Sequence, residues 1–188
     1  INNKVAIVIL TLNAENEISF LLDKINCEKY AVHIIDSSSD DDTKRICSKY
    51  NCQFHVISRL EFNHGATREY ARKLVGSEIV VFFTQDAIPI NLQTVDNLLI
   101  PILSGVASVS YARQVAKNSA NILESFTREY NYGTQSELRS IKDREKYGIY
   151  TYFSSDSCAA YLSKDLDEIG GFKDVILSED HLASAELL

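Results

Sequence analysis

Apolar residues in the first half of the chain fall into short continuous runs. Four such runs, rich in β-branched and aromatic residues, cover residues 5–10, 32–35, 54–57 and 79–83. A continuous apolar run of this kind is typical of a strand that is buried on both faces of a sheet. The pattern therefore predicts four strands, and those at residues 5–10 and 79–83 are expected to be buried.

The segments between these runs have a different pattern, in which apolar residues recur at roughly every third or fourth position. Such spacing predicts amphipathic helices. These helices cover residues 18–25, 43–50, 65–74 and 92–103, and a further strand is predicted over residues 106–112. Strands that alternate with helices indicate βαβ units, so we predict an α/β fold around a mostly parallel sheet.

The second half of the chain lacks this alternation over residues 117–146, which are polar and of mixed charge. We expect this segment to be a helical excursion from the sheet, with Glu124, Arg128 and Glu129 on its solvent side. The aromatic run at residues 149–153 then predicts a return to the sheet as a strand.

Two glycines and an acidic segment mark the end of the chain. Gly170-Gly171-Phe172 predicts a turn, and residues 178–181 open a final helix. The length of 188 residues suits a single domain, 1–188. No apolar run approaches the roughly 18 residues that a membrane span requires, and residues 1–4 lack the pattern of a secretory signal.

Polar side chains follow three of the predicted strands. Thr11 and Asn13 come after the first strand, Asp36 ends the second, and Asp86 follows the fourth. The carboxyl ends of parallel strands meet at one edge of a sheet, where open α/β sheets bind their ligands. A carboxylate there is a candidate to hold a divalent cation against a phosphate-bearing substrate. As an isolated residue, however, Asp86 is more typical of a helix cap or a turn.

Charge and cysteine content argue against some classes of protein. The chain has a net charge of −7, and no cluster of basic residues is long enough to follow a phosphate backbone, so we expect no nucleic-acid partner. Its four cysteines form no dense disulfide framework. The spacing of Cys47, Cys52 and His55 is too open for a typical four-ligand zinc site, so we expect buried free thiols.

Short motifs along the chain resemble those of the family 2 inverting glycosyltransferases, which have the GT-A fold. These motifs keep the family's order and lie at residues 11–13, 36–43, 86, 170–172 and 179–180. A second set resembles the rhamnosyltransferase-like branch of that family, at residues 62–68, 84–89, 111–114, 131–132 and 153–158. The resemblance implies a three-layer α/β/α sandwich with a mostly parallel, Rossmann-like sheet.

The resemblance also implies a division of labour along the chain. Residues 1–112 would form the half that binds a nucleotide-sugar, and residues 113–188 the half on the acceptor side, which we expect to be cut short at its C-terminus. Asp180 would be the general base that deprotonates the acceptor hydroxyl. Asp86 would bind Mg²⁺ or Mn²⁺, which bridges the diphosphate of the donor.

The resemblance implies contacts to both substrates. The nucleotide-sugar would be bound by residues from the first half, namely Thr11, Asn13, Asp36, Asp40, Asp42, His64, Arg68, Gln85 and Asp86. The acceptor side would include Arg113, Asp156 and Glu179. The residue types suit the chemistry, since a poorly nucleophilic sugar hydroxyl gains from a positioned carboxylate and the departing diphosphate from a cation.

The chain departs from the family pattern at two positions. Gln85-Asp86-Ala87 offers one acid where the usual D-x-D metal motif offers two, so the cation would depend on the diphosphate to complete its ligands. Glu69 stands where many family members have Asn.

By resemblance, the chain would transfer a sugar, such as the deoxyhexose L-rhamnose, from a dTDP- or UDP-linked donor to a saccharide or lipid-linked acceptor. Such an enzyme would act in polysaccharide synthesis, in the cytoplasm at the inner face of the membrane, with peripheral membrane association. One alternative is a domain of the same fold that binds a nucleotide-sugar without turnover. Another is a sugar nucleotidylyltransferase, but that class needs a Gly-rich basic loop after the first strand, which residues 10–13 lack.

Overall fold

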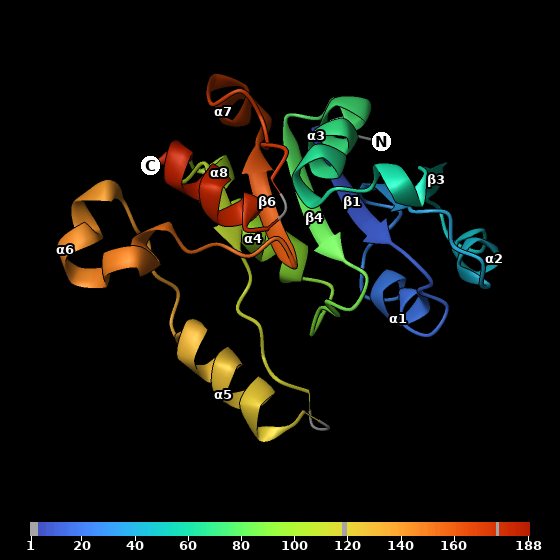
Figure 1. Cartoon of the computed structure of the whole chain (residues 1–188), viewed down its shortest axis with the longest axis horizontal. Coiled ribbons are helices and arrows are strands. Elements are labelled where there is room, and N and C mark those ends of the chain that lie inside the picture. Colours follow the sequence, from blue (N-terminus) through green and yellow to red (C-terminus); the bar gives the residue numbers. More distant parts are fainter. Residues whose placement is uncertain (1–3, 118–119, 176) are drawn as a thin grey trace.

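The structure is a computed structural model that describes residues 4–117, 120–175 and 177–188. Within these residues the centre of the protein is one six-stranded sheet in the order β3-β2-β1-β4-β6-β5 (Figure 1). Its strands are β1 (Val5–Thr11), β2 (Ala31–Asp36), β3 (Gln53–Val56), β4 (Ile79–Thr84), β5 (Val109–Tyr111) and β6 (Cys158–Leu162).

The four strands from the first half of the chain are parallel, as their alternation with helices predicts. β1 lies between β2 and β4, with Thr11 opposite Asp36 and Leu10 opposite Thr84. The C-terminal ends of these three strands therefore lie side by side at one edge of the sheet, which we call the carboxyl edge. The antiparallel strands β6 and β5 complete the sheet beyond β4.

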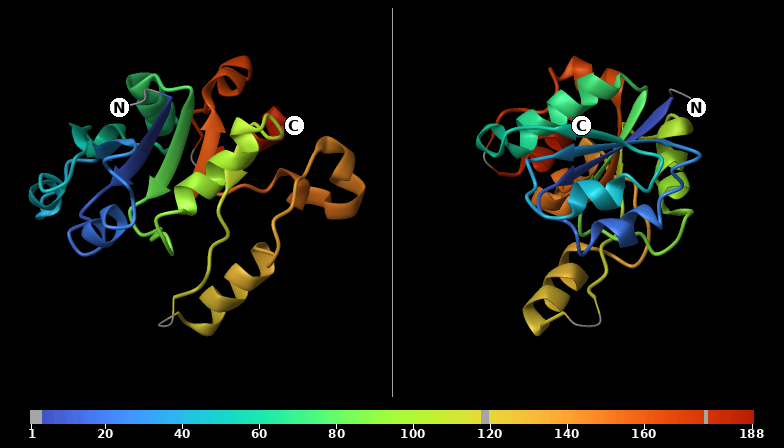
Figure 2. Two further views of the ribbon diagram at one scale, coloured as in Figure 1. Left: turned by 180° about the vertical axis from the view of Figure 1, so that it is seen from behind. Right: turned by 90° about the vertical axis from the view of Figure 1, so that its right-hand side faces the viewer.

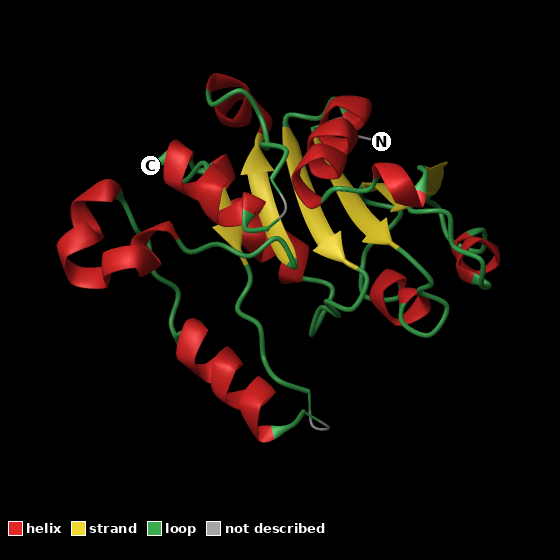
Figure 3. Ribbon diagram, in the orientation of Figure 1, coloured by secondary structure: helices red, strands yellow, loops and turns green. Residues whose placement is uncertain are grey.

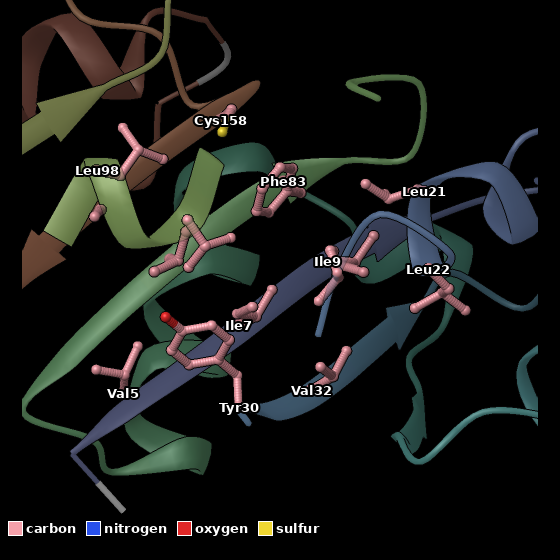
Figure 4. Close-up of a cluster of buried hydrophobic side chains, with 14 of the residues drawn as sticks. Val5, Ile7, Ile9, Leu21, Leu22, Tyr30, Val32, Phe83, Leu98 and Cys158 are labelled. Atoms are coloured by element: carbon pink, nitrogen blue, oxygen red, sulfur yellow. The ribbon is translucent and has the colours of Figure 1, made fainter. Parts of the chain in front are cut away.

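Helices cover both faces of the sheet, which gives the predicted three layers (Figure 2). They are α1 (Ile18–Leu22), α2 (Thr43–Cys47), α3 (His64–Val75), α4 (Thr94–Leu103), α7 (Ser163–Glu168) and α8 (Glu179–Leu187). Helices α1, α2 and α4 pack on the face that carries Val5, Ile7 and Ile9 of β1 (Figure 4). Helices α3, α7 and α8 pack on the opposite face, against Val8 and Leu10. This alternation along β1 explains why its residues 5–10 are all apolar.

An arm made of residues 113–117 and 120–152 extends away from the sheet (Figure 3). It contains two helices, α5 (Ile122–Asn131) and α6 (Arg144–Tyr147), and two 3₁₀ helices, η2 (Ile141–Asp143) and η3 (Gly148–Tyr152). The predicted excursion is therefore helical as expected, although residues 118–119 of it lie outside the described residues. None of the described helices is both long and apolar enough to cross a membrane.

The predicted solvent side of α5 is only partly correct. Glu129 is exposed, but Glu124 and Arg128 are half-buried. Four apolar or aromatic side chains of this helix are also exposed, namely Ile122, Leu123, Phe126 and Tyr130. The expectation assumed that the apolar side of the helix packs on the body, and within the described residues α5 stands away from it (Figure 1).

The prediction of a strand at residues 149–153 is wrong, because residues 149–152 belong to the 3₁₀ helix η3. The place beside β4 belongs instead to β6, whose sequence Cys158-Ala159-Ala160-Tyr161-Leu162 contains no β-branched residue. Ala159, Ala160 and Tyr161 are fully buried between the two helical layers. Packing on the sheet, which intrinsic strand propensity does not measure, therefore decided which segment became the strand.

Candidate functional site

Asp36 is held firmly at the carboxyl edge of the sheet. It ends β2, is only 2% exposed, and accepts hydrogen bonds from the Thr11 hydroxyl at 2.9 Å and from Ser39. Ser39 donates both its backbone N–H, at 2.8 Å, and its hydroxyl, at 2.6 Å. Because a carboxylate accepts about four hydrogen bonds, Asp36 keeps little free capacity and chiefly braces the loop that follows β2.

The loops after β1 and β2 are tied to each other. Asn13 adopts a left-handed backbone conformation with φ of 50°, which Asn tolerates better than most residues. Its side-chain oxygen accepts from the backbone N–H of Asp40 at 3.1 Å and from Arg59. Arg59 also pairs with Asp40 at 3.2 Å, whereas Asp42 pairs with Arg45 on the surface. Asp40 and Asp42 are therefore both exposed residues of the loop after β2.

A cavity of about 260 Å³ lies at the carboxyl edge. Four of the predicted nucleotide-sugar residues line it, namely Thr11, His64, Arg68 and Gln85. The other lining residues were assigned no role from the sequence, and they are Leu10, Leu12, Ser37, Arg59, Phe62 and Thr84. Asn13, Asp36, Asp40, Asp42 and Asp86 do not line the cavity but lie on the same loops.

A larger cavity, of about 360 Å³, lies at the opposite edge of the sheet, beside the first residues of β1, β2 and β3. None of the predicted site residues lines it. Ligands of parallel α/β sheets bind at the carboxyl ends of the strands, so the smaller cavity is the candidate site.

The side chain of Gln85 closes the gap between β4 and β1. Its carbonyl oxygen accepts from the backbone N–H of Leu12 at 2.8 Å, and its amide nitrogen donates to the carbonyl of Leu12 at 3.2 Å. The next residue, Asp86, is exposed, and its carboxylate has no ion pair or hydrogen bond among the described residues. No group of three or more metal-ligating side chains occurs in the part of the chain that the structure describes.

A metal at Asp86 would therefore find one carboxylate from the protein. A hard cation takes six or more oxygen ligands, so this donor set fits only if a bound diphosphate and water supply the others. Asp86 fits that requirement as the exposed member of a strand-end loop next to the cavity.

Helix α3 is docked closely on the segment that leads to α8. A Cβ on Gly65 would lie 1.9 Å from the carbonyl oxygen of Lys173, so only glycine permits this approach. One turn later the Glu69 carboxylate accepts from the backbone N–H of Phe172 at 3.1 Å and pairs with Arg72. Gly171, with φ of 77°, leaves the room that Glu69 occupies. Glu69 thus ties α3 to the Gly-Gly turn.

Three charged side chains form a buried cluster beside this docking site. Arg68 Nη1 donates to Glu179 at 2.6 Å, and Arg68 Nε lies 3.0 Å from Asp156 Oδ2. The N–H of Nε does not point at that oxygen, and neither atom has a hydrogen-bond partner among the described residues. Tyr161 donates its hydroxyl to the other oxygen of Asp156 at 2.6 Å. Asp156 and Glu179, predicted on the acceptor side, are therefore 2% and 6% exposed and contact Arg68.

The burial of this cluster raises the pKa values of Asp156 and of its neighbour Tyr161. The pKa of the Asp156 carboxyl is raised to about 7, mainly by burial and to a smaller extent by the nearby carboxylates of Asp180 and Glu179. The guanidinium of Arg68 and the hydroxyl of Tyr161 act in the opposite direction but only in part. Burial, together with the neighbouring Asp156 carboxylate, likewise raises the pKa of Tyr161 well above its usual range.

Asp180 stands at the first turn of α8 and is partly exposed. Its carboxylate accepts from its neighbour's backbone N–H, that of His181, at 2.8 Å and from the backbone N–H of Asp156 at 3.3 Å. Its carbonyl accepts from the Ser154 hydroxyl at 2.8 Å. Because β6 is antiparallel to β4, the residues before β6 return to the carboxyl edge, where Ser157 accepts from the backbone N–H of Thr84. Asp180 and the cavity therefore share one edge of the sheet.

The remaining candidate, Arg113, is exposed at the start of the arm, and among the described residues its side chain makes no ion pair with this cluster. Arg59 and Phe62 line the cavity but were not predicted as site residues, although both follow β3 at the same carboxyl edge. Tyr161 was also missed, and it lies within a strand that the sequence did not predict.

Comparison with known proteins places this geometry in context. Residues 6–170 match the family described as Glycosyl transferase family 2. The O-antigen chain rhamnosyltransferase WbaN of Salmonella anatum is 40% identical over 157 residues, which cover 82% of this chain and 50% of WbaN. RfbN, an O-antigen chain rhamnosyltransferase of Salmonella typhimurium strain LT2, is 33% identical, covering 98% of this chain and 61% of RfbN. The chain thus spans about half to three fifths of these curated relatives.

Solved structures share the fold. S. aureus TarS 1-349 in complex with UDP-GlcNAc has a TM-score of 0.70 at 21% identity, over 98% of this chain and 53% of TarS 1-349. The mannosyltransferase PcManGT of Pyrobaculum calidifontis, in complex with GDP-Man and Mn²⁺, has a TM-score of 0.64 at 16% identity, over 98% of this chain and 51% of PcManGT. Identities this low show the GT-A type fold alone.

Proposed function

The chain belongs to glycosyl transferase family 2, and from this we propose that it transfers a sugar from a nucleotide-diphosphate donor to an acceptor hydroxyl with inversion, using Asp180 as general base. One observation carries the proposal. Arg68 lines the cavity at the carboxyl edge and also pairs with Glu179, the neighbour of Asp180. A donor in the cavity and the base on α8 would therefore be adjacent.

The donor that best suits the chain is a dTDP- or UDP-linked deoxyhexose such as L-rhamnose. The two curated relatives are named rhamnosyltransferases, and TarS is solved with UDP-GlcNAc. The cavity residues support a nucleotide, since Leu10, Leu12 and Phe62 offer apolar contacts and Arg59 and Arg68 carry positive charge. Thr11, Asn13, Asp36, Asp40 and Asp42 would shape the loops around the nucleoside, and His64 and Gln85 the walls.

A divalent cation is the natural complement to the lone carboxylate of Asp86. When bound with the donor, Mg²⁺ or Mn²⁺ would neutralise charge on the departing diphosphate. Asp86 would hold it on the protein side, and the mannosyltransferase neighbour solved with Mn²⁺ supports this choice. A single protein carboxylate implies that the cation and the donor bind together.

The acceptor we propose is a saccharide, free or lipid-linked, in O-antigen-type polysaccharide synthesis at the cytoplasmic face of the membrane. The names of the curated relatives support this class. The arm supports peripheral membrane association, because α5 exposes Ile122, Leu123 and Phe126. Residues 113–153 also carry seven basic and five acidic side chains, although the whole chain has a net charge of −7. This local excess of positive charge favours binding of the arm to an anionic membrane surface.

The substitution Asp180→Asn tests the base. It keeps the size of the side chain but cannot accept the acceptor's proton, so we expect kcat for transfer from dTDP-L-rhamnose to a synthetic saccharide acceptor to fall about 10²–10⁴-fold. Donor affinity, measured by calorimetry, should be retained. The matched control is Asp174→Asn, an exposed carboxylate a few residues earlier.

Full transfer by Asp180→Asn would exclude Asp180 as the base. A wild-type protein that binds the donor but neither transfers nor hydrolyses the sugar over days would instead support a domain that binds nucleotide-sugars without turnover.

A further inference from the structure

The buried cluster of Arg68, Asp156 and Glu179 joins three distant parts of the chain at one point. Arg68 comes from α3, Asp156 from the segment before β6, and Glu179 from the first turn of α8. Their side chains are 3%, 2% and 8% exposed, so water contributes little to their solvation. Arg68 lines the cavity, and Glu179 is the residue before Asp180. Asp156 donates its backbone N–H to the Asp180 carboxylate.

Asp180 is connected to this cluster in two ways. The residue before it, Glu179, is anchored to Arg68 at 2.6 Å. The backbone N–H of Asp156 donates to the Asp180 carboxylate at 3.3 Å, while the Asp156 side chain is fixed by Arg68 and Tyr161. The position of the Asp180 carboxylate therefore depends on the buried side chains of Arg68, Asp156 and Glu179.

Stability alone explains this cluster poorly. Buried ion pairs contribute little or nothing compared with apolar residues of similar volume, because desolvation of the charges offsets their attraction. Here Arg68 Nε and Asp156 Oδ2 also lack hydrogen-bond partners among the described residues, which makes the arrangement less favourable still. Its evident physical effect is to hold three segments in one fixed arrangement at the cavity.

We propose that Asp156 and Glu179 are positioning residues, which through Arg68 hold the carboxylate of Asp180 in the orientation that proton transfer requires. The inference rests on the proposed role of Asp180 as general base. It also gives Asp156 and Glu179 a role different from acceptor contact, since both are buried and neither lines the cavity.

The test uses Asp156→Asn in the whole chain, which keeps shape and backbone but removes the charge that faces Arg68. A displacement of a catalytic group by about 1 Å lowers rates on the order of 10²-fold. We expect kcat for transfer from dTDP-L-rhamnose to fall about 10–100-fold, with donor KM within about twofold of wild type. The matched control Glu168→Gln, an exposed acid on α7, should leave kcat unchanged.

A double-mutant cycle separates positioning from general weakening of the fold. If Asp156 acts through Asp180, then adding Asp156→Asn to Asp180→Asn should lower the residual kcat no further, because residues that act as a unit are not additive. An equal loss in both backgrounds would overturn the inference. So would a single variant as active as Glu168→Gln.

A second variant keeps the test decisive. If Asp156→Asn fails to fold, as judged by circular dichroism and melting temperature, Glu179→Gln takes its place, with the same expected loss and the same non-additivity. Failure of the proposed function has a different signature: the wild type would not transfer the sugar, or Asp180→Asn alone would keep full activity.

Discussion

At the scale of single residues, the carboxylates of the carboxyl edge differ in how far the protein has already used them. Asp36 accepts three hydrogen bonds from Thr11 and Ser39, and Asp156 is enclosed by Arg68 and Tyr161. Asp86 is exposed and has no partner among the described residues. A carboxylate that is exposed and accepts no hydrogen bond from the protein is free to bind a cation. Burial therefore distinguishes the structural carboxylates Asp36 and Asp156 from Asp86, the candidate metal ligand.

Asp86→Ala tests this distinction. We expect wild-type protein to bind dTDP-L-rhamnose more tightly when Mn²⁺ is present, and the variant to lose that gain because the cation has lost its protein ligand. Isothermal titration calorimetry with and without Mn²⁺ measures the difference, with Asp174→Ala as the exposed control. An undiminished gain in the Asp86 variant would contradict the assignment.

The pKa of Asp156 predicts a dependence of stability on pH. Since the pKa is about 7 in the folded chain and roughly 3.9 in an unfolded one, the folded state binds an extra proton between these values. Because the folded state binds more protons than the unfolded state in this range, the free energy of unfolding decreases as the pH rises. We expect the unfolding free energy of wild type, minus that of Asp156→Asn, to fall by about 2–3 kcal/mol from pH 5 to pH 8.

Urea unfolding of both proteins at a series of pH values measures this difference, and Asp174→Asn serves as the matched exposed control. Groups other than Asp156 contribute to both proteins and cancel in the subtraction. A difference that stays constant, or that rises with pH, would show that Asp156 is ionised throughout this range.

At the scale of elements, α3 is the helix that joins the two sides of the site. His64 and Arg68 on it line the cavity. Gly65 and Glu69 dock it on the turn before α8, through a close backbone approach and a hydrogen bond to Phe172. The Glu at position 69, where many family members have Asn, is thereby explained by its contact with the Gly-Gly turn.

The helix α5 carries a prediction about membranes. Its exposed apolar side chains should enter the interface of a vesicle of phosphatidylethanolamine and phosphatidylglycerol. We expect the pair Leu123→Ser and Phe126→Ser to lower vesicle binding about tenfold or more in co-sedimentation, because apolar area drives such insertion.

The control for α5 is the pair Ile100→Ser and Leu103→Ser, which removes apolar side chains of similar exposure from α4 on the body. Added salt should weaken wild-type binding if the basic residues of the arm contribute. Equal losses in both pairs would show that the arm has no special affinity for the vesicle.

At the scale of the whole molecule, function depends on bringing separate segments to one edge of the sheet. The parallel strands β1, β2 and β4 place their loops there, and the antiparallel strand β6 begins at the same edge, just after Asp156. Asp180 of α8 joins this edge through the hydrogen bond from the backbone N–H of Asp156. A ligand that bridges these segments should therefore stabilise the molecule as a whole.

A thermal-shift screen of UDP-, dTDP- and GDP-sugars with Mn²⁺ tests this. A ligand at 100 times its Kd adds about 2.7 kcal/mol to the stability of the folded state, which for a chain of this length raises Tm by about 5–10 °C. We expect dTDP- or UDP-sugars to produce such a shift and GDP-sugars a smaller one. A larger shift with GDP-sugars would contradict the proposed donor class.

The sequence by itself determined the part of the fold that local patterns encode. Apolar runs and helical spacing predicted β1 to β4 and the helices between them, because a strand buried on both faces must be apolar throughout. Polar residues after those strands predicted the carboxyl edge as the site, since parallel strands end together. The motif order indicated the family before any coordinates did.

Only the tertiary structure decided what each acid can do. Burial between two helical layers made a strand of residues 158–162 despite their low strand propensity, and sequence patterns do not report that burial. The same packing enclosed Asp156 and Glu179 with Arg68 and left Asp86 exposed. Desolvation depends on neighbours that are far apart in the chain, so the roles of identical side chains diverge only once the chain is folded.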